Sequence, residues 1–361
     1  MVYRVIGIMS GSSLDGLDIA FVELDDSGGK WQYNLKCALC YEYEEEWSQK
    51  LQKAKTLNAF DYLVLDAAYG KYIGEKINRF IDEQQLHHQV QLIASHGHTV
   101  FHAPGENMTA QLGDGAAIAA TTGINVVSSL RSMDVALGGQ GAPIVPVGEK
   151  LLWGDTNYFL NIGGIANVSA KKDETTIAFD VCPANRVLNM LAQLAGKPFD
   201  EDGDMAAAGS VDIDLLIKLN GLEYYRQLPP KSLANEFGTD DVFPLIQSFN
   251  LPVEDALRTF TEHIAEQVTG AFFDMDARDG KLLVTGGGAF NIYLVNRLKA
   301  MLKELNIEVI VPAREVVQYK EALVMALLGL LRWREENTVM SSVTGAVRSS
   351  IGGAVWIGLE A

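Results

Sequence analysis

The fold is indicated most directly by residues 3–24, which read YRVIGIMSGSSLDGLDIAFVEL. Residues 3–9 and 19–24 are rich in β-branched and other apolar side chains, whereas residues 10–18 are mainly serine, glycine and aspartate. This pattern predicts two strands joined by a wide polar turn, which is a β-hairpin. Apolar side chains then recur at every second position of residues 31–43, so we expect a third strand there.

A second stretch of the same kind begins at residue 158. Residues 158–162 predict a strand that enters the glycine turn NIGGIANVS at 161–169, and residues 176–179 predict a further strand that ends at Asp180. A strand, a polar glycine turn and another strand therefore stand near the start of both halves of the chain. Two duplicated α/β halves that face each other would leave a cleft between two phosphate-binding turns.

Segments with helical spacing alternate with short apolar runs along the rest of the chain. We expect helices over residues 44–80, 116–122 (stopping at Gly123), 254–275, 322–331 and from Asn291 to about Leu305, and strands over residues 90–94, 124–128, 281–285 and 307–311. Such alternation indicates an α/β protein with mostly parallel strand pairing. We expect one domain from residues 1–136 and 338–361 and a second from residues 137–337, with a boundary near the glycine-rich residues 138–143.

The length and composition fit a folded protein, since the chain has 361 residues, of which 48% are apolar and 21% are charged. Its 46 acidic and 29 basic residues give a net charge of −17, which argues against binding to nucleic acid or to an anionic membrane surface. The longest apolar run, residues 322–331, is too short to span a bilayer. The lack of a signal-peptide pattern and the three cysteines lead us to expect a cytoplasmic protein.

The turn of the first hairpin is a candidate phosphate-binding site. Its backbone N–H groups and serine hydroxyls are suitable donors to phosphate oxygens, and Asp15 and Asp18 could orient a hydrated Mg²⁺ ion. The alternative is an ordinary turn of glycine, serine and aspartate. Residues 286–288, three glycines between a predicted strand and a helix, would let the backbone come close to a nucleotide.

Asp180 stands at the predicted end of a strand, where open α/β sheets bind ligands, and its carboxylate could act as a general base. The alternative is that it caps the helix expected to open near Pro183. His96, His98 and His102 could be metal ligands, but no carboxylate or thiolate at matching spacing accompanies them. Hydrogen-bonding side chains that line a pocket are the preferred interpretation of these histidines.

Two acidic features leave alternatives open. Residues 200–204 place four carboxylates around Gly203, and they form either a solvated loop or part of a cleft in which like charges raise a pKa. Glu321 directly precedes the apolar run 322–331 and could be no more than a favourable charge at a helix N-terminus.

Taken together, these motifs resemble those of the anhydro-N-acetylmuramic acid kinases, a family within the sugar kinase/heat-shock chaperone/actin fold. The stretches that carry the resemblance are GIMSGSSLDGLDIA (7–20), SHGHTVFH (95–102), QLGDGAAIAATTGINVV (111–127), DVALGGQGAPIVP (134–146), NIGGIANVS (161–169), AFDVCPANRVLN (178–189), FDEDGDMAAAG (199–209), LPPKS (228–232), VTGGGAFN (284–291), EALVMALLGLLR (321–332) and SVTGA (342–346). They span nearly the whole chain in order. The departures are Ser12 for the usual threonine, His98 for glutamine, an arginine-rich run reduced to Arg131, and residues 181–184, which lack two usual glycines.

The resemblance implies an α/β fold of two actin-like domains with an interdomain cleft that binds ATP and Mg²⁺. It also implies one coupled reaction in peptidoglycan recycling. Water attacks C1 of 1,6-anhydro-N-acetylmuramic acid, the ring opens, and O6 takes the γ-phosphoryl group to give N-acetylmuramic acid 6-phosphate and ADP. Asp180 is the implied base for the water.

The resemblance carries further residues by position. ATP would be bound by Gly11, Ser12, Ser13, Leu14, Asp15, Gly16, Leu17, Asp18, Gly163, Gly164, Gly286, Gly287 and Gly288, with Mg²⁺ held through ATP and water near Asp15 and Asp18. The sugar would be bound by His98, Arg131, Asp134 and Glu321, with the Arg131 guanidinium suited to the lactyl carboxylate. A homodimer is a further expectation of the resemblance.

Two other functions remain open on the sequence. One is a kinase of the same fold that acts on an ordinary hexose or N-acetylhexosamine, in which Asp180 deprotonates a sugar hydroxyl and no water enters. The other is a non-enzymatic, nucleotide-gated binding module like the chaperone and actin relatives of the fold. The two alternatives differ from the main interpretation in sugar specificity and in the need for a client-binding region.

Overall fold

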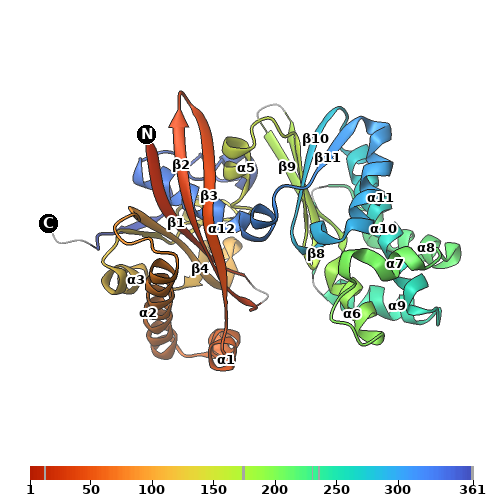
Figure 1. The fold of residues 1–361 in the computed structure, drawn as a ribbon, viewed down its shortest axis with the longest axis horizontal. Helices are drawn as coiled ribbons and strands as arrows, with labels where there is room; N and C mark the ends of the chain where they lie inside the picture. Colours follow the sequence, from red (N-terminus) through yellow and green to blue (C-terminus); the bar gives the residue numbers. More distant parts are fainter. Residues whose placement is uncertain (12–13, 173–174, 230, 235, 359–361) are drawn as a thin grey trace. The chain divides into compact units, whose positions relative to one another are not determined.

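The computed structural model describes residues 1–11, 14–172, 175–229, 231–234 and 236–358. Its contacts divide the chain into two compact units (Figure 1). Unit 1 comprises residues 1–154 and 319–361, and unit 2 comprises residues 155–318. Each unit has its own sheet and its own hydrophobic core.

The chain passes between the units at positions other than those expected, which were after residues 136 and 337. Helix α5, Pro146–Leu152, belongs to unit 1, where a Cβ on Gly148 would contact Val324. The second crossing lies inside helix α12, Arg314–Trp333, whose backbone leaves the helical range at Tyr319. The positions of both crossings depend on packing between segments that are far apart in the sequence. The local composition therefore does not predict them.

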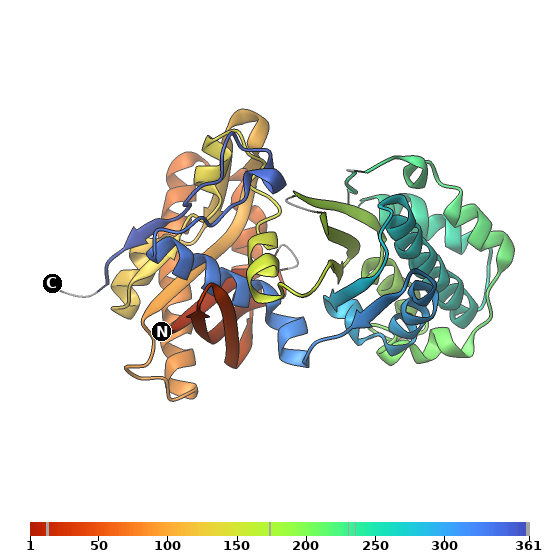
Figure 2. The ribbon, with the colours of Figure 1, turned by 90° about the horizontal axis from the view of Figure 1, so that it is seen from above.

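Unit 1 is built on a seven-stranded sheet. Its strands are β1 Val2–Ser10, β2 Gly16–Ser27, β3 Lys30–Glu42, β4 Leu92–Ala103, β5 Met108–Leu112, β6 Val126–Ser128 and β12 Ala354–Trp356. The order is β12-β6-β4-β1-β2-β3, with β5 paired to β4. Strands β1, β2 and β3 form an antiparallel meander, and β4 and β6 continue the sheet in parallel beside β1. The C-terminal strand β12 pairs antiparallel with β6 (Figure 2).

Unit 2 repeats this arrangement in a five-stranded sheet. Its strands are β7 Tyr158–Ile162, β8 Ile165–Lys172, β9 Thr175–Pro183, β10 Gly280–Thr285 and β11 Ile307–Ile310. Strands β7, β8 and β9 form an antiparallel meander, and β10 and β11 add in parallel beside β7 in the order β11-β10-β7-β8-β9. The repeat expected from the two glycine turns is therefore present in the strand order, and the expected α/β fold of two actin-like units is confirmed.

Helices cover both faces of the unit 1 sheet. The other helices of this unit are α1 Glu45–Lys53, α2 Ala59–Glu83, α3 Gly115–Thr122, α4 Ser132–Ala136 and α13 Ser341–Thr344. Ile6 and Ile8 of β1 share one core cluster with Ile73 of α2. Gly7, between them, faces the opposite side, where a Cβ would collide with the carbonyl oxygen of Ala322 in α12. Because side chains alternate across a strand, β1 lies between α2 and α12.

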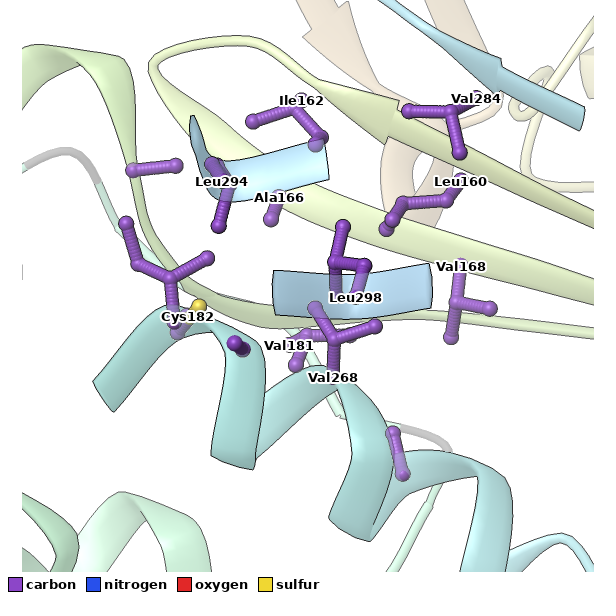
Figure 3. Close-up of a cluster of buried hydrophobic side chains, with 14 of the residues drawn as sticks. Leu160, Ile162, Ala166, Val168, Val181, Cys182, Val268, Val284, Leu294 and Leu298 are labelled. Carbon is purple, nitrogen blue, oxygen red and sulfur yellow. The ribbon is translucent and has the colours of Figure 1, made fainter. Parts of the chain in front are cut away.

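The helices of unit 2 share one hydrophobic core cluster with the strands of its sheet. They are α6 Asn185–Leu194, α7 Asp204–Ala208, α8 Ile213–Asn220, α9 Phe243–Gln247, α10 Val253–Asp274 and α11 Ile292–Leu302. Figure 3 shows Leu160 and Ile162 of β7 gathered with Val268 of α10 and Leu298 of α11 in one buried cluster. This core fixes the carboxyl end of β7, where the glycine turn of the second hairpin begins.

Several helices begin and end where local signals place them. Asn58, Asp114 and Asp212 accept hydrogen bonds from backbone N–H groups in the first turns of α2, α3 and α8. Gly123 ends α3 in the left-handed conformation, as expected. Among the described residues, the structure contains no helix with both the length and the apolar character needed to traverse a bilayer.

Two strands are longer than the sequence indicates. The strand expected at residues 90–94 is β4, which runs on through the histidine-rich segment to Ala103. The strand expected to end at Asp180 is β9, which continues to Pro183, so Asp180 lies inside the strand and not at its end. Both extensions are paired with neighbouring strands, β5 and β8.

Candidate active site

The first hairpin turn is described in part. Ser12 and Ser13 lie outside the described residues. Leu14 has a positive φ of 58° and donates its N–H to the Gly11 carbonyl at 3.4 Å, while Asp15 is exposed. Gly16 and Leu17 already belong to β2, and the Leu17 side chain is fully buried in the core. Leu17 can therefore serve ATP only through its backbone.

Asp18 is the charged group of this hairpin with the most perturbed titration. Its pKa is raised to about 6, chiefly by partial burial and to a smaller extent by the charges of Asp15 and Glu321, while a hydrogen bond from the Cys40 thiol opposes the shift. Desolvation raises the pKa of the Glu321 carboxyl, and the charges of Lys320 and Arg131 oppose the shift. The charges of Asp15 and Glu321 thus each repel that of Asp18.

Glu321 does not stand at the start of its helix. Helix α12 begins at Arg314, and the non-helical backbone of Tyr319 comes two residues before Glu321. The side chain therefore follows a kink, and the simple helix-terminus interpretation is wrong. Its charge acts on both Asp18 and Arg131, which connects the hairpin carboxylates with the guanidinium expected to bind the sugar.

Arg131 is held in a fixed orientation by two acceptors. Its Nε donates to Nε2 of His96 at 2.8 Å, and its Nη1 donates to the carbonyl oxygen of Gly141 at 2.5 Å. Burial and the charge of Arg131 lower the pKa of His96 to about 3, so the ring is neutral at physiological pH. Nδ1 of His96 lies 2.9 Å from the Gly97 carbonyl oxygen, so Nδ1 carries the proton and Nε2 accepts from Arg131.

Asp134 lies beneath this loop and is fully buried. One carboxylate oxygen accepts from the Gly141 N–H at 2.7 Å, and the other accepts from the Thr344 hydroxyl at 2.7 Å. A Cβ on Gly139 would collide with the same carboxylate. The carboxylate oxygens expected to bind sugar are therefore occupied by the protein, and Asp134 shapes the loop whose Gly141 carbonyl holds Arg131.

The three histidines of β4 have separate partners. Nδ1 of His98 lies 3.0 Å from the Ser10 hydroxyl, and Nδ1 of His102 lies 3.0 Å from the Thr109 hydroxyl. Burial lowers the pKa of His98 to about 4, and this side chain is also nearly inaccessible. Within the described part of the chain, no three His, Cys, Asp or Glu side chains gather in a group that could hold a metal ion.

The glycines selected in unit 2 meet at the carboxyl end of β7. Gly286 has a positive φ of 80°, and a Cβ there would lie 2.6 Å from Oδ1 of Asn161. A Cβ on Gly288 would collide with the Ile162 side chain. The backbone N–H of Asn185 donates to the Gly163 carbonyl at 3.0 Å, and that of Ala184 donates to the Gly164 carbonyl at 2.8 Å. The structure therefore brings Gly163, Gly164 and Gly286–Gly288 together around the start of α6.

The sequence analysis did not select Arg186, which the structure places at this glycine turn. Its side chain is exposed, and Nε lies 3.7 Å from where a Cβ on Gly164 would be. Asn185 beside it donates its side-chain N–H to the Ile162 carbonyl at 3.0 Å. Both residues stand in the stretch AFDVCPANRVLN, but only the tertiary structure shows that this stretch packs on the second hairpin turn.

Asp180 projects from a β-bulge in edge strand β9. Asn167 is paired with Asp180 and Ala166 with Cys182, so Val181 is the extra residue. The backbone N–H of Leu233 donates to Oδ2 of Asp180 at 2.9 Å. Partial burial raises the pKa of the Asp180 carboxyl, and the hydrogen bond from Leu233 opposes the shift. A bulge redirects a side chain, and a carboxylate with a raised pKa is a stronger base.

The helix-capping interpretation of Asp180 is wrong. Helix α6 begins at Asn185 with Ala184 as its N-cap residue and has no side-chain capping bond.

The acidic segment at residues 200–204 contains a capping residue for helix α7. Asp200 is buried, and its two carboxylate oxygens accept from the N–H groups of Met205 and Ala206 in α7 at 2.8 and 3.0 Å.

Comparison with known proteins gives matches along almost the entire chain. The model of a family described as anhydro-N-acetylmuramic acid kinase matches residues 3–358. Curated relatives with that name include a protein of Hydrogenovibrio crunogenus, 31% identical with 97% of both chains covered. Another, from Salinibacter ruber, is 35% identical over 95% of this chain and 93% of the relative.

A solved structure, the activator of the 2-hydroxyisocaproyl-CoA dehydratase from Clostridium difficile with bound ADPNP, also resembles the chain. It is 15% identical, with a TM-score of 0.45 over 92% of this chain and 96% of that chain. The fold assignment rests on the duplicated strand order and not on this similarity.

Proposed function

The chain belongs to the anhydro-N-acetylmuramic acid kinase family, and from this premise we propose how its residues carry out the family's reaction. The substrates are 1,6-anhydro-N-acetylmuramic acid, ATP and water, and the products are N-acetylmuramic acid 6-phosphate and ADP. The reaction returns a fragment of the cell wall to amino-sugar metabolism.

The observation that carries the mechanism is the environment of Asp180. One carboxylate oxygen is held by the Leu233 N–H, and burial makes the group more basic than an ordinary aspartate. We assign the other oxygen to the water. As the water oxygen bonds to C1, its proton passes to Asp180 and the C1–O6 bond breaks. O6 then bonds to the γ-phosphorus, and the bond from phosphorus to the β,γ-bridging oxygen breaks as ADP leaves.

The resemblance assigns backbone donors for ATP to turns of both units. In unit 1 these are the N–H groups of the turn that contains Gly11 and Asp15, to which the resemblance adds Ser12 and Ser13. In unit 2 the donors lie at the two glycine turns around β7, with Arg186 as a nearby cation. Phosphoryl transfer depends chiefly on alignment and on neutralising charge, so backbone N–H groups and one guanidinium suit the task.

Magnesium fits the carboxylates of unit 1. Asp18 has its pKa raised partly by the charges of Asp15 and Glu321, and a divalent cation would relieve that repulsion. Asp15 and Asp18 would hold the ion through its water shell, since Mg²⁺ keeps several waters. When bound with ATP, the ion would supply positive charge to the phosphate oxygens.

Arg131 is the proposed ligand of the sugar's lactyl carboxylate. Two of its N–H groups are used within the described residues, by His96 and Gly141, which orients the guanidinium for the remaining contacts. We assign His98 and Asp134 to support of the site, because both are buried and hydrogen-bonded to other residues. Glu321, which is exposed, is the remaining candidate for direct sugar contact.

The test is ADP release by the purified protein with ATP and Mg²⁺ and a panel of sugars. The panel holds anhydro-N-acetylmuramic acid, N-acetylmuramic acid, N-acetylglucosamine and glucose. Turnover with the anhydro sugar alone supports the coupled reaction. Equal or faster turnover of an open sugar would instead identify an ordinary sugar kinase, in which Asp180 deprotonates a hydroxyl group.

A homodimer and a cytoplasmic location stay predictions. Sedimentation at equilibrium would measure the first, and cell fractionation the second.

A further inference from the structure

A short segment on the outer side of strand β9 holds Asp180 at three of its groups. The Tyr224 hydroxyl donates to the Asp180 carbonyl oxygen at 2.6 Å, and the Asp180 N–H donates to the Lys231 carbonyl at 3.0 Å. The Leu233 N–H donates to the carboxylate at 2.9 Å. The main chain of Asp180 and its side chain are thus fixed by one stretch, of which residues 223–229 and 231–233 are described.

The position of β9 explains why these bonds matter. The strand lies at the edge of its sheet, beyond β8. Every second residue of an edge strand turns its N–H and C=O away from the neighbouring strand, and these groups need partners elsewhere. At Asp180 the partners are Lys231 and Tyr224, so the residue that carries the carboxylate is paired on its open side as well.

Tyr224 is itself firmly held. Its side chain is buried, its ring lies 5.6 Å from the ring of Tyr225 in an edge-on arrangement, and Nζ of Lys231 stands 4.6 Å from its centre. Tyr225 extends the anchoring, because its hydroxyl lies 3.0 Å from Nε2 of the fully buried His263.

His263 connects the tyrosine pair to the helices of unit 2. Its Nδ1 lies 2.7 Å from Oδ1 of Asn220, and burial lowers the pKa of the ring to about 3. The ring is therefore neutral, donates from Nδ1 to Asn220 and accepts from the Tyr225 hydroxyl at Nε2. The one-turn helix at Glu223–Arg226 is in this way tied to α8 and α10.

We propose that Tyr224 is a positioning residue for Asp180, an inference that rests on the function proposed above. Its hydroxyl holds the carbonyl of Asp180 at the bulge, and the bulge determines where the carboxylate meets the attacking water. A displacement of about 1 Å in such a group costs about 100-fold in rate, so a partial loss of restraint has a measurable effect.

The experiment compares Tyr224→Phe with wild type in the coupled reaction. We expect kcat to fall about tenfold, while KM for ATP and for the anhydro sugar stays within about twofold. The solvent deuterium isotope effect on kcat should rise, because proton transfer to Asp180 becomes more rate-limiting. Tyr158→Phe is the matched control, since its hydroxyl donates to the Arg278 carbonyl at 2.9 Å at the opposite end of β7. It should leave kcat unchanged.

Several outcomes would overturn the inference. One is a kcat for Tyr224→Phe within twofold of wild type when Asp180→Asn has lost turnover. Another is a loss of kcat with no rise in the isotope effect and with a matching fall in thermal stability. Retained turnover by Asp180→Asn would instead remove the proposed base, whatever Tyr224 does. If Tyr224→Phe does not fold, Leu233→Pro, which removes the N–H donor to the carboxylate, carries the same expectation.

Discussion

At the residue scale, the candidate site contains carboxylates whose ionised form is less stable than it would be in water. Burial raises the pKa of Asp180, and burial with neighbouring charge raises that of Asp18 to about 6. Such groups cost stability in the absence of ligand, and they are typical of positions kept for chemistry or binding. This loss of stability predicts how the free energy of unfolding changes when such a carboxylate is replaced by a neutral side chain.

Asp18→Asn should stabilise the ligand-free protein at pH 7.5 and remove activity. Since the folded pKa of about 6 exceeds the unfolded value of 3.8, wild type bears the full cost of the buried charge above pH 6 and none below about pH 4. We expect a gain of about 1–2 kcal/mol at pH 7.5, allowing for partial exposure, and little difference from wild type at pH 4. Thermal unfolding at both pH values checks this, and an equal gain at both would contradict it.

Arg131→Ala should weaken sugar binding and spare ATP. Loss of a charged hydrogen-bond donor predicts a rise of about tenfold or more in KM for the anhydro sugar, with KM for ATP nearly unchanged. Arg131→Lys should have a KM for the anhydro sugar between those of wild type and Arg131→Ala, because lysine keeps the charge but not the paired N–H groups. Steady-state kinetics in both substrates measures the split, and an unchanged sugar KM would remove Arg131 from the binding site.

Residues were predictable where the chemistry is local. Asp180, Arg131 and the glycine turns were selected from the sequence because their types and neighbours resemble a known pattern, and their roles stay predictions. Tyr224 was not, since its contact with Asp180 spans 44 residues and leaves no pattern. Asp134 was assigned to the sugar because a sequence cannot show that Gly141 and Thr344 occupy the carboxylate.

At the element scale, close packing of α12 on the unit 1 sheet depends on small residues. A Cβ on Gly329 would collide with Ala94 of β4. Gly329→Ala should therefore lower the free energy of unfolding by about 1–3 kcal/mol. Gly270→Ala is the matched control in α10, because a Cβ there has nothing within 4 Å, and it should raise stability by about 0.5–1 kcal/mol. Denaturant unfolding compares the two, and equal effects would refute the packing argument.

Elements were predictable where periodicity and end signals agree. The first hairpin, β7 and the end of α3 at Gly123 follow directly from residue pattern. The second part of β4 was missed because Gly97, with a positive φ of 73°, and the histidines around it interrupt the alternation. The early start of α12 was missed because its first residues, 314–318, are largely polar and belong to the other unit.

At the scale of the whole molecule, the two crossings of the chain are linked inside unit 1 by a buried ion pair. Lys320, just after the second crossing, lies 2.6 Å from Glu149 of α5, just before the first, and both side chains are 8% exposed. The two sheets of similar topology each have their own core. The Lys320–Glu149 pair lies where the two connections between these units meet unit 1. The pair therefore connects α5 with α12 inside unit 1, close to where the chain leaves this unit and re-enters it.

Lys320→Met should be strongly destabilising, because it removes the cation that lies 2.6 Å from the buried Glu149 carboxylate. Breaking such a pair costs about 3–5 kcal/mol. Lys281→Met is the matched control, since the Lys281–Asp155 pair at 2.9 Å is 41% and 76% exposed, and its loss should cost less than about 1 kcal/mol. Chemical unfolding of both variants tests the difference, and similar midpoints would show that the buried pair adds nothing.

The central claim is that Asp180 takes the proton of the water that opens the anhydro ring. The most direct measurement is turnover of anhydro-N-acetylmuramic acid by Asp180→Asn, with binding of ATP and of the sugar measured by calorimetry on the same preparation. The account predicts that kcat falls about 10²- to 10⁴-fold while both affinities stay within a few-fold of wild type. Turnover within about threefold of wild type, with both ligands bound normally, would contradict it.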